Sequence, residues 1–193
     1  MLAVVAVIAI LVGIVLSTVG YVQAKGAQSR ANAEIQSLAT ACEAYKTDYG
    51  IYPVSVSWTN TLNPKTNGDS TDAGTLGSAA APISGNYPYQ NSSLYLYTVL
   101  TGDTNCTGLA TVSYFPIKPT MCYRPSSTLP ISNSNTVRYL MDPWGNSYGY
   151  STAAAQVSSS NGYNPTFDLW STGGTVTTGS APTNTVLQWV KNW

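Results

Sequence analysis

The chain has 193 residues, of which only 8% are charged, and its eight acidic and eight basic side chains give a formal net charge of zero. This length allows one domain plus an additional helix, and the neutral composition without a basic patch argues against a nucleic-acid partner. No histidine is present. Histidine-dependent catalysis and histidine-ligated metals are therefore excluded, and because no glycine-rich phosphate loop precedes a helix, we expect a protein that is not an enzyme.

Residues 1–24 carry no charged side chain and are apolar around the whole helical circumference. As a helix rising about 1.5 Å per residue, roughly 22 residues span about 33 Å, which is enough to cross the hydrocarbon of a bilayer. Such a surface has to be buried in lipid or in a protein assembly. A cleaved export signal and a simple membrane anchor are two interpretations, although a cleaved signal usually has a basic leader and a shorter apolar core.

Residues 25–50 are predicted to continue the same helix as an amphipathic second half. Apolar side chains recur there at spacings of three and four, which is typical of a helix packed on a core. The opposite side is expected to face solvent, and Gly50 is expected to end the helix. The continuous helix favours a third interpretation, in which the apolar half packs among identical helices. The side chains expected to pack on the head are Ile35, Leu38, Cys42, Tyr45 and Tyr49, and those expected on the solvent side are Arg30, Glu34, Glu43 and Lys46.

Residues 51–193 are predicted to form a β-rich globular head with long loops. The fold class expected is α+β, with the second half of the helix packed on a small antiparallel sheet. The segment at 94–100 is dense in aromatic and apolar residues and fits either a strand or a short helix. The C-terminal Val186, Trp189 and Val190 are expected to cover part of the sheet. Strands are expected at 112–117, 137–141, 147–151 and 166–171, with a β-turn at 142–145.

Three cysteines are compatible with an oxidising compartment. Cys106 and Cys122 flank an apolar segment, and a disulfide between them would close a loop of about 16 residues and stabilise the fold by about 3 kcal/mol. We expect this pairing, with a bridge to Cys42 as the alternative. Cys42 otherwise fits a small buried apolar residue on the helix.

Three segments resemble one protein family. MLAVVAVIAIL at 1–11 resembles the part of type IV pilins and type II secretion pseudopilins that follows the family's processing motif, and YKTDYGIYP at 45–53 is similar to the end of the long helix in major pseudopilins. DPWGNSYGY at 142–150, followed by FDLWSTGG at 167–174, resembles two strands and turns of the pseudopilin sheet. The family's glutamate would fall immediately before Met1, so either the natural start codon lies upstream or the first residues were trimmed. The proline that many members carry midway along the apolar segment is absent, and residues 54–140 match no family motif.

The resemblance implies a pilin-like fold and a structural subunit of a helical, type IV pilus-like extracellular filament. Such a subunit is inserted in the inner membrane before assembly, handled by pilus or secretion assembly machinery, and polymerised with identical subunits through its N-terminal helix. The residues expected in the filament core or membrane are Val4, Val5, Val7, Ile8, Ile10, Leu11, Ile14, Val15 and Leu16. The residues that carry the family's turn motifs are Asp142, Pro143, Trp144, Gly145, Asp168 and Trp170.

Two alternatives remain open. A major pseudopilin would form a periplasmic pseudopilus, and related pseudopilins bind calcium in the loop after the last of these strands. Residues 169–193 contain neither Asp nor Glu, so we expect that calcium site to be absent, which favours the pilus, and we expect no other cofactor. A membrane-anchored module whose aromatic side chains stack on sugars is the third interpretation.

Overall fold

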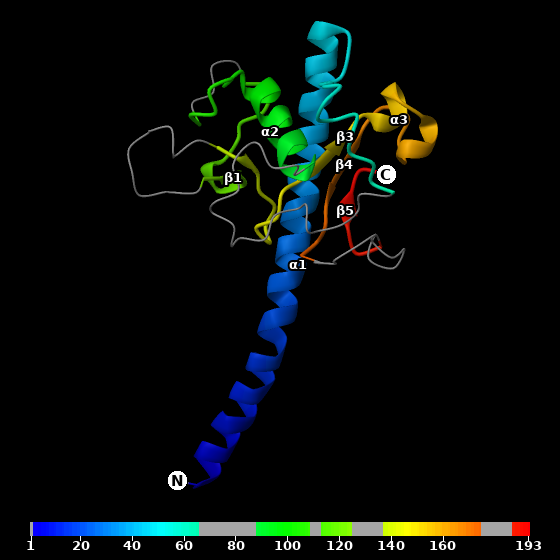
Figure 1. Cartoon of the computed structure of the whole chain (residues 1–193). Coiled ribbons are helices and arrows are strands. Elements are labelled where there is room, and N and C mark those ends of the chain that lie inside the picture. The colour runs from blue at the N-terminus through cyan, green and yellow to red at the C-terminus, as the bar shows by residue number, and fades with distance from the viewer. Residues whose placement is uncertain (1, 66–87, 109–112, 125–136, 175–186) are drawn as a thin grey trace.

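The computed structural model describes residues 2–65, 88–108, 113–124, 137–174 and 187–193, and within residues 2–19 it describes the surroundings of only Ile8 and Gly13. A long N-terminal helix runs through a head made of shorter helices and small antiparallel sheets, which is an α+β architecture (Figure 1). The helix extends out of one side of the head, and the N-terminus lies at its far end.

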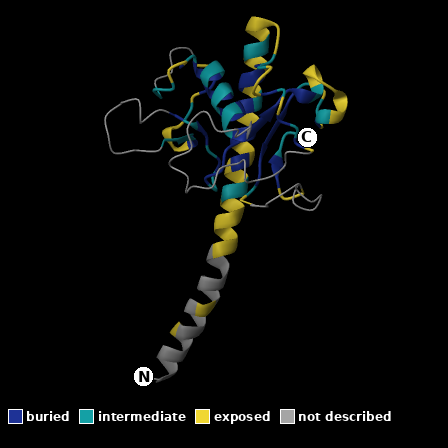
Figure 2. Cartoon of the chain, viewed as in Figure 1, coloured by how far each residue is buried: buried dark blue, intermediate teal, exposed yellow. Residues whose placement is uncertain are grey.

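Helix α1 (Leu2–Tyr49) is 48 residues long. One stripe of its second half is completely buried, and Figure 2 shows that burial begins where the helix enters the head. Gly50 ends the helix with a φ of 77°, a conformation that glycine adopts without steric cost, and its N–H donates to the carbonyl of Lys46 at 2.7 Å. The stripe consists of Ala31, Ile35, Leu38, Ala41 and Cys42, spaced by three and four residues.

Two side chains of α1 differ from the expectation. Glu34, which was expected to face solvent, is buried, because it borders the apolar stripe and meets Tyr148 of the head there. Tyr49, which was expected to pack on the head, is 62% exposed, because the last turn of α1 projects past the head (Figure 1). Its ring stacks on that of Tyr45 with centroids 4.4 Å apart, and Tyr45 itself is partly buried against the core.

Helix α2 (Pro88–Thr101) shows that the ambiguous segment at 94–100 is helical. Its buried side chains follow a helical spacing, and the helix lies beside α1 and against the strands (Figure 1). The Ser93 hydroxyl accepts from the N–H of Leu140 at 2.9 Å, which fastens the helix to the neighbouring strand. The buried apolar residues of α2 are Tyr89, Leu96, Tyr97 and Leu100.

Two small sheets replace the single sheet that was expected. Strand β1 (Cys122–Tyr123) pairs antiparallel with β2 (Tyr139–Leu140), and β3 (Gly149–Ser151), β4 (Asp168–Ser171) and β5 (Val190–Lys191) form a second antiparallel sheet in that order. The expected strand at 112–117 is wrong for its described residues, 113–117, which form no strand. Short helices η1 (Pro119–Met121), α3 (Ala153–Gln156) and η2 (Ser159–Asn161) complete the described elements.

Aromatic side chains close the three-stranded sheet. Gly149 faces Trp170 in the register, and a Cβ at Gly149 would lie 2.4 Å from the indole, so the ring packs directly on the β3 backbone. Trp189 is buried and lies parallel to Trp170 with ring centroids 6.0 Å apart, and Val190 is buried beside it. The C-terminal segment therefore covers this sheet, although Val186 lies outside the described residues.

The expected disulfide is absent, because all three cysteines are free thiols in the structure. The carbonyl of Cys106 accepts from the N–H of Val137, whereas Cys122 pairs with Leu140 in the two-stranded sheet. Cys42 is buried on α1, away from solvent.

Candidate functional site

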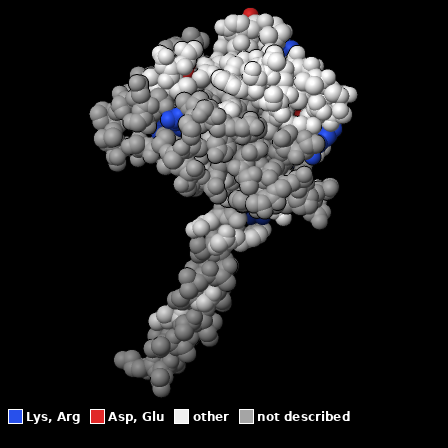
Figure 3. Space-filling view, in the orientation of Figure 1, with Lys and Arg blue, Asp and Glu red and all other residues white. Residues whose placement is uncertain are grey.

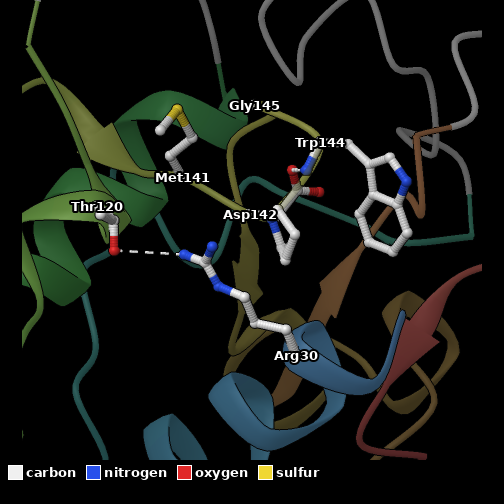
Figure 4. A pocket seen from close by; sticks show the side chains of 7 residues that line it. Arg30, Thr120, Met141, Asp142, Trp144 and Gly145 are labelled. Atoms are coloured by element: carbon white, nitrogen blue, oxygen red, sulfur yellow. Dashed lines mark hydrogen bonds between the residues drawn. The ribbon is translucent and has the colours of Figure 1, made fainter. Parts of the chain in front are cut away.

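A groove of about 450 Å³ lies between α1 and the turn that follows β2 (Figure 4). We call it the Arg30 groove, after the charged side chain that reaches into it from the helix. Its walls combine one cation with apolar and aromatic surface. The lining residues are Arg30, Thr120, Met141, Asp142, Pro143, Trp144 and Gly145.

The turn at 142–145 forms one wall and is held rigidly. The Gly145 N–H donates to the carbonyl of Asp142 at 3.0 Å, and Gly145 has a φ of 90° that suits glycine. One carboxylate oxygen of Asp142 accepts from the N–H groups of Trp144 at 2.9 Å and Asn146 at 2.8 Å, and the other accepts from the Ser171 hydroxyl at 2.5 Å. Burial raises the pKa of Asp142 above its ordinary value, and these hydrogen bonds oppose the shift.

Arg30 forms the opposite wall. Its Nε donates to Glu34 Oε1 at 2.7 Å, and its Nη2 reaches Thr120 Oγ1 at 3.4 Å. The other oxygen of Glu34 accepts from the Tyr148 hydroxyl at 2.6 Å. The side chain of Arg30 stays 46% exposed, and these two contacts use only part of its five N–H donors. The guanidinium is thus fixed in place and still able to bind an anion.

Trp144 supplies the aromatic surface of the groove. Its ring packs on Gly174, where a Cβ would lie 2.6 Å from the indole, and Gly173 and Gly174 both have positive φ. The turn at 142–145 and the turn after β4 are thereby joined. These are the two segments whose sequences resemble the pseudopilin turns.

The other motif residues serve the interior of the head. Both oxygens of Asp168 accept backbone N–H groups, from Tyr163 at 2.9 Å and Asn164 at 2.8 Å, and burial raises its pKa. Trp170 donates from its indole nitrogen to the Tyr89 hydroxyl at 2.9 Å. Asp142 and Asp168 therefore act as acceptors for backbone and hydroxyl donors, and each has both oxygens occupied.

No group of three acidic, cysteine or histidine side chains gathers around a point in the described part of the chain. The carboxylates of Asp142 and Asp168 already face hydrogen-bond donors, which a calcium ion would have to displace. The loop at 175–186, which the family resemblance places near a calcium site, lies outside the described residues. The absence of that site stays a prediction.

The expected filament-core residues lie along the first half of α1. Of these, Ile8 is described and is 54% exposed. Among the residues whose surroundings the structure describes, no helix combines the length and the apolar character needed to cross a bilayer. The remaining expected core residues, Val4, Val5, Val7, Ile10, Leu11, Ile14, Val15 and Leu16, lie outside the residues described in this way.

Sequence reasoning did not identify the Arg30 groove or the Glu34–Tyr148 contact. Arg30 and Thr120 are 90 positions apart and Glu34 and Tyr148 are 114 apart, so no local pattern links them. For Glu34 the sequence did contain a signal, because a charged residue that borders the apolar stripe of α1 needs a hydrogen-bond partner when it is buried. Comparisons with models of known protein families, with curated proteins and with solved structures found no match.

Proposed function

We propose that the chain is a structural subunit of a helical, type IV pilus-like extracellular filament. It is held in the inner membrane before assembly and polymerises with identical subunits through the first half of α1. The observation that carries this proposal is a single 48-residue helix whose buried residues, among those with described surroundings, all lie in its second half. The sequence of its first half is uncharged and apolar on all sides.

The exposed apolar side chains of the helix support burial in an assembly. Ile8, Tyr21 and Val22 are all more than half exposed on the part of α1 that extends from the head (Figure 2). Apolar side chains of this size each gain about 1.5–3 kcal/mol on burial. Transfer from lipid to a bundle of identical helices adds little hydrophobic energy, so close packing between rods provides the cohesion.

Replacing Ile8 with lysine tests the proposal. A lysine in an apolar helix core costs about 2.5–3.5 kcal/mol. We expect Ile8→Lys to abolish sheared surface filaments in electron micrographs while the head keeps its native fold, measured by tryptophan fluorescence. Ile8→Val is the matched control at the same site and should assemble normally. Normal filaments from Ile8→Lys would refute polymerisation through this part of the helix.

A periplasmic pseudopilus is the alternative filament. The observation that favours it is the contact of Trp144 with Gly174, because it joins the two segments that resemble pseudopilin turns. A calcium titration of the full chain separates the two: a tight site that raises the unfolding temperature supports the pseudopilus, and no stabilisation supports the pilus. Filaments on the cell surface, rather than in the periplasm, support the pilus independently.

A further inference from the structure

We infer that the Arg30 groove binds the Asp48–Tyr49 end of α1 from a second copy of this chain. The inference rests on the proposed filament function and names the contact between neighbouring heads. It follows from the charges that the described surface exposes, the apolar side chains next to them, and the length of α1.

The distribution of acidic side chains selects the partner surface. Within the described residues, the carboxylates that reach solvent are Glu43 and Asp48, and both lie in the last turns of α1. The remaining described acids, Glu34, Asp103, Asp142 and Asp168, are buried. Asp69 and Asp72 lie outside the described residues. An Arg30 guanidinium that meets another copy therefore finds its described anionic partners at the C-terminal end of that copy's helix.

The apolar surfaces match as well. Tyr49 follows Asp48 directly and Ile51 comes two residues later, and both are more than half exposed. The groove offers Trp144 and Pro143 beside the guanidinium, so it can take a carboxylate and a neighbouring aromatic ring together. Asp48 Oδ2 accepts from the Tyr114 hydroxyl at 2.7 Å, which positions the carboxylate and leaves its other oxygen for Arg30. Figure 3 shows how few charged side chains the head presents in that view. With so few charges, one pair of opposite charges between two copies has a large share in setting their relative orientation.

The length of the helix requires the partner to be another molecule. Arg30 and Asp48 are on the same continuous helix and lie about 27 Å apart along its axis, at about 1.5 Å per residue. The groove and the helix end are therefore different surfaces of one subunit, and joining them makes a head-to-tail contact. Contacts of this type build rings or open helical filaments instead of two-fold dimers, and the shift along the rod favours the open filament. The contact shifts neighbouring copies by about 27 Å along their rods.

Zero-length cross-linking tests the contact directly. Arg30→Lys keeps the positive charge and adds an amine that a carbodiimide couples to carboxylates in contact with it. We expect assembled filaments of this variant to yield a cross-linked peptide pair joining position 30 to Asp48 or Glu43, identified by mass spectrometry. Since about 27 Å separates positions 30 and 48 within one chain, a link between them has to join two copies. A link to Glu34 serves as the internal positive control, because that carboxylate is adjacent in the same chain.

Charge variants provide the second test and leave the part-buried Arg30–Glu34 pair in place. Thr120 is exposed at the groove wall, so Thr120→Glu introduces a competing carboxylate next to Arg30, and Thr120→Gln is the neutral control. We expect Thr120→Glu and Asp48→Lys each to lower the yield of sheared filaments about tenfold. Thr120→Gln should assemble like wild type, and the double variant Thr120→Glu with Asp48→Lys should recover much of the yield.

The outcomes separate the inference from the function on which it rests. The inferred contact is overturned if the Thr120→Glu and Asp48→Lys variants assemble as well as wild type and Arg30→Lys filaments give no link from position 30 to Glu43 or Asp48. The filament proposal stands in that case, because wild-type filaments still form. A wild-type chain that forms no filaments overturns both. Loss of assembly in each single variant with recovery in the double variant supports both.

Discussion

Tyr148→Phe tests how the head is fastened to the rod. The hydroxyl of Tyr148 donates to the buried carboxylate of Glu34 at 2.6 Å, across 114 positions of sequence. Burial and this hydrogen bond raise the pKa of Tyr148 above its ordinary value of 10.0, so its hydroxyl stays protonated and remains a donor at neutral pH. The substitution removes one oxygen atom and keeps the ring in the core.

The structure sets the size of the expected loss. A hydrogen bond to a charged group contributes about 1.5–3 kcal/mol, and its removal leaves Glu34 with Arg30 as its side-chain partner among the described residues. Tyr150, in β3 and two residues after Tyr148, provides the control, since it is equally buried but donates to a neutral carbonyl, that of Pro53, at 2.8 Å. Tyr150→Phe is expected to cost about 0.5–1.5 kcal/mol.

Urea unfolding of the full chain in detergent measures both variants. All five tryptophans lie in the head, so their fluorescence reports unfolding of the head rather than of the rod. We expect Tyr148→Phe to lower the free energy of unfolding more than Tyr150→Phe does, with unchanged slopes against urea. Losses that agree within about 0.5 kcal/mol would refute the idea that the charge on Glu34 strengthens this contact.

Two further predictions concern the buried acid and the thiols. Burial raises the pKa of Asp142, so the folded state binds the proton of this carboxyl more tightly than the unfolded state does. The carboxyl therefore stabilises the fold most at a pH below its ordinary pKa of 3.8. This stabilisation is lost as the pH rises through the raised pKa. Asp142→Asn should therefore gain stability relative to wild type over that rise, and parallel stability curves would contradict this. Burial also raises the pKa of Cys122 from 9.0 to about 11, so its alkylation at pH 8 should be about a hundredfold slower than that of an ordinary thiol. After unfolding without reductant all three cysteines should react, whereas a single reactive thiol would indicate a disulfide.

Local patterns predicted the parts of the fold that depend on neighbouring residues. The spacing of Ile35, Leu38 and Cys42 defines a helical stripe whatever the head contains, and this stripe is buried. Proline and glycine at Pro143 and Gly145 encode the turn through backbone chemistry alone. Both features follow from interactions within a few residues.

Long-range contacts decided the rest. The segment at 94–100 has side chains that suit strand or helix, and packing against α1, β2 and β3 fixed it as a helix. Glu34 is buried where Tyr148 supplies a donor from 114 positions away, and Cys106 and Cys122 are both free in the folded chain. The Arg30 groove combines positions from α1, η1 and the turn after β2, so it exists only once these elements are packed together.

The scarcity of ion pairs has a consequence for handling the protein. Arg30 and Glu34 form the one salt bridge among the described residues, and the rest of the described head is held by apolar packing and by hydrogen bonds, several of them to buried carboxylates. Moderate salt screens charges exposed at a boundary between molecules far more than contacts in an interior. In the proposed filament, raising the ionic strength should therefore weaken the contact between neighbouring heads while each head stays folded and the rods, which are packed through apolar side chains, stay together.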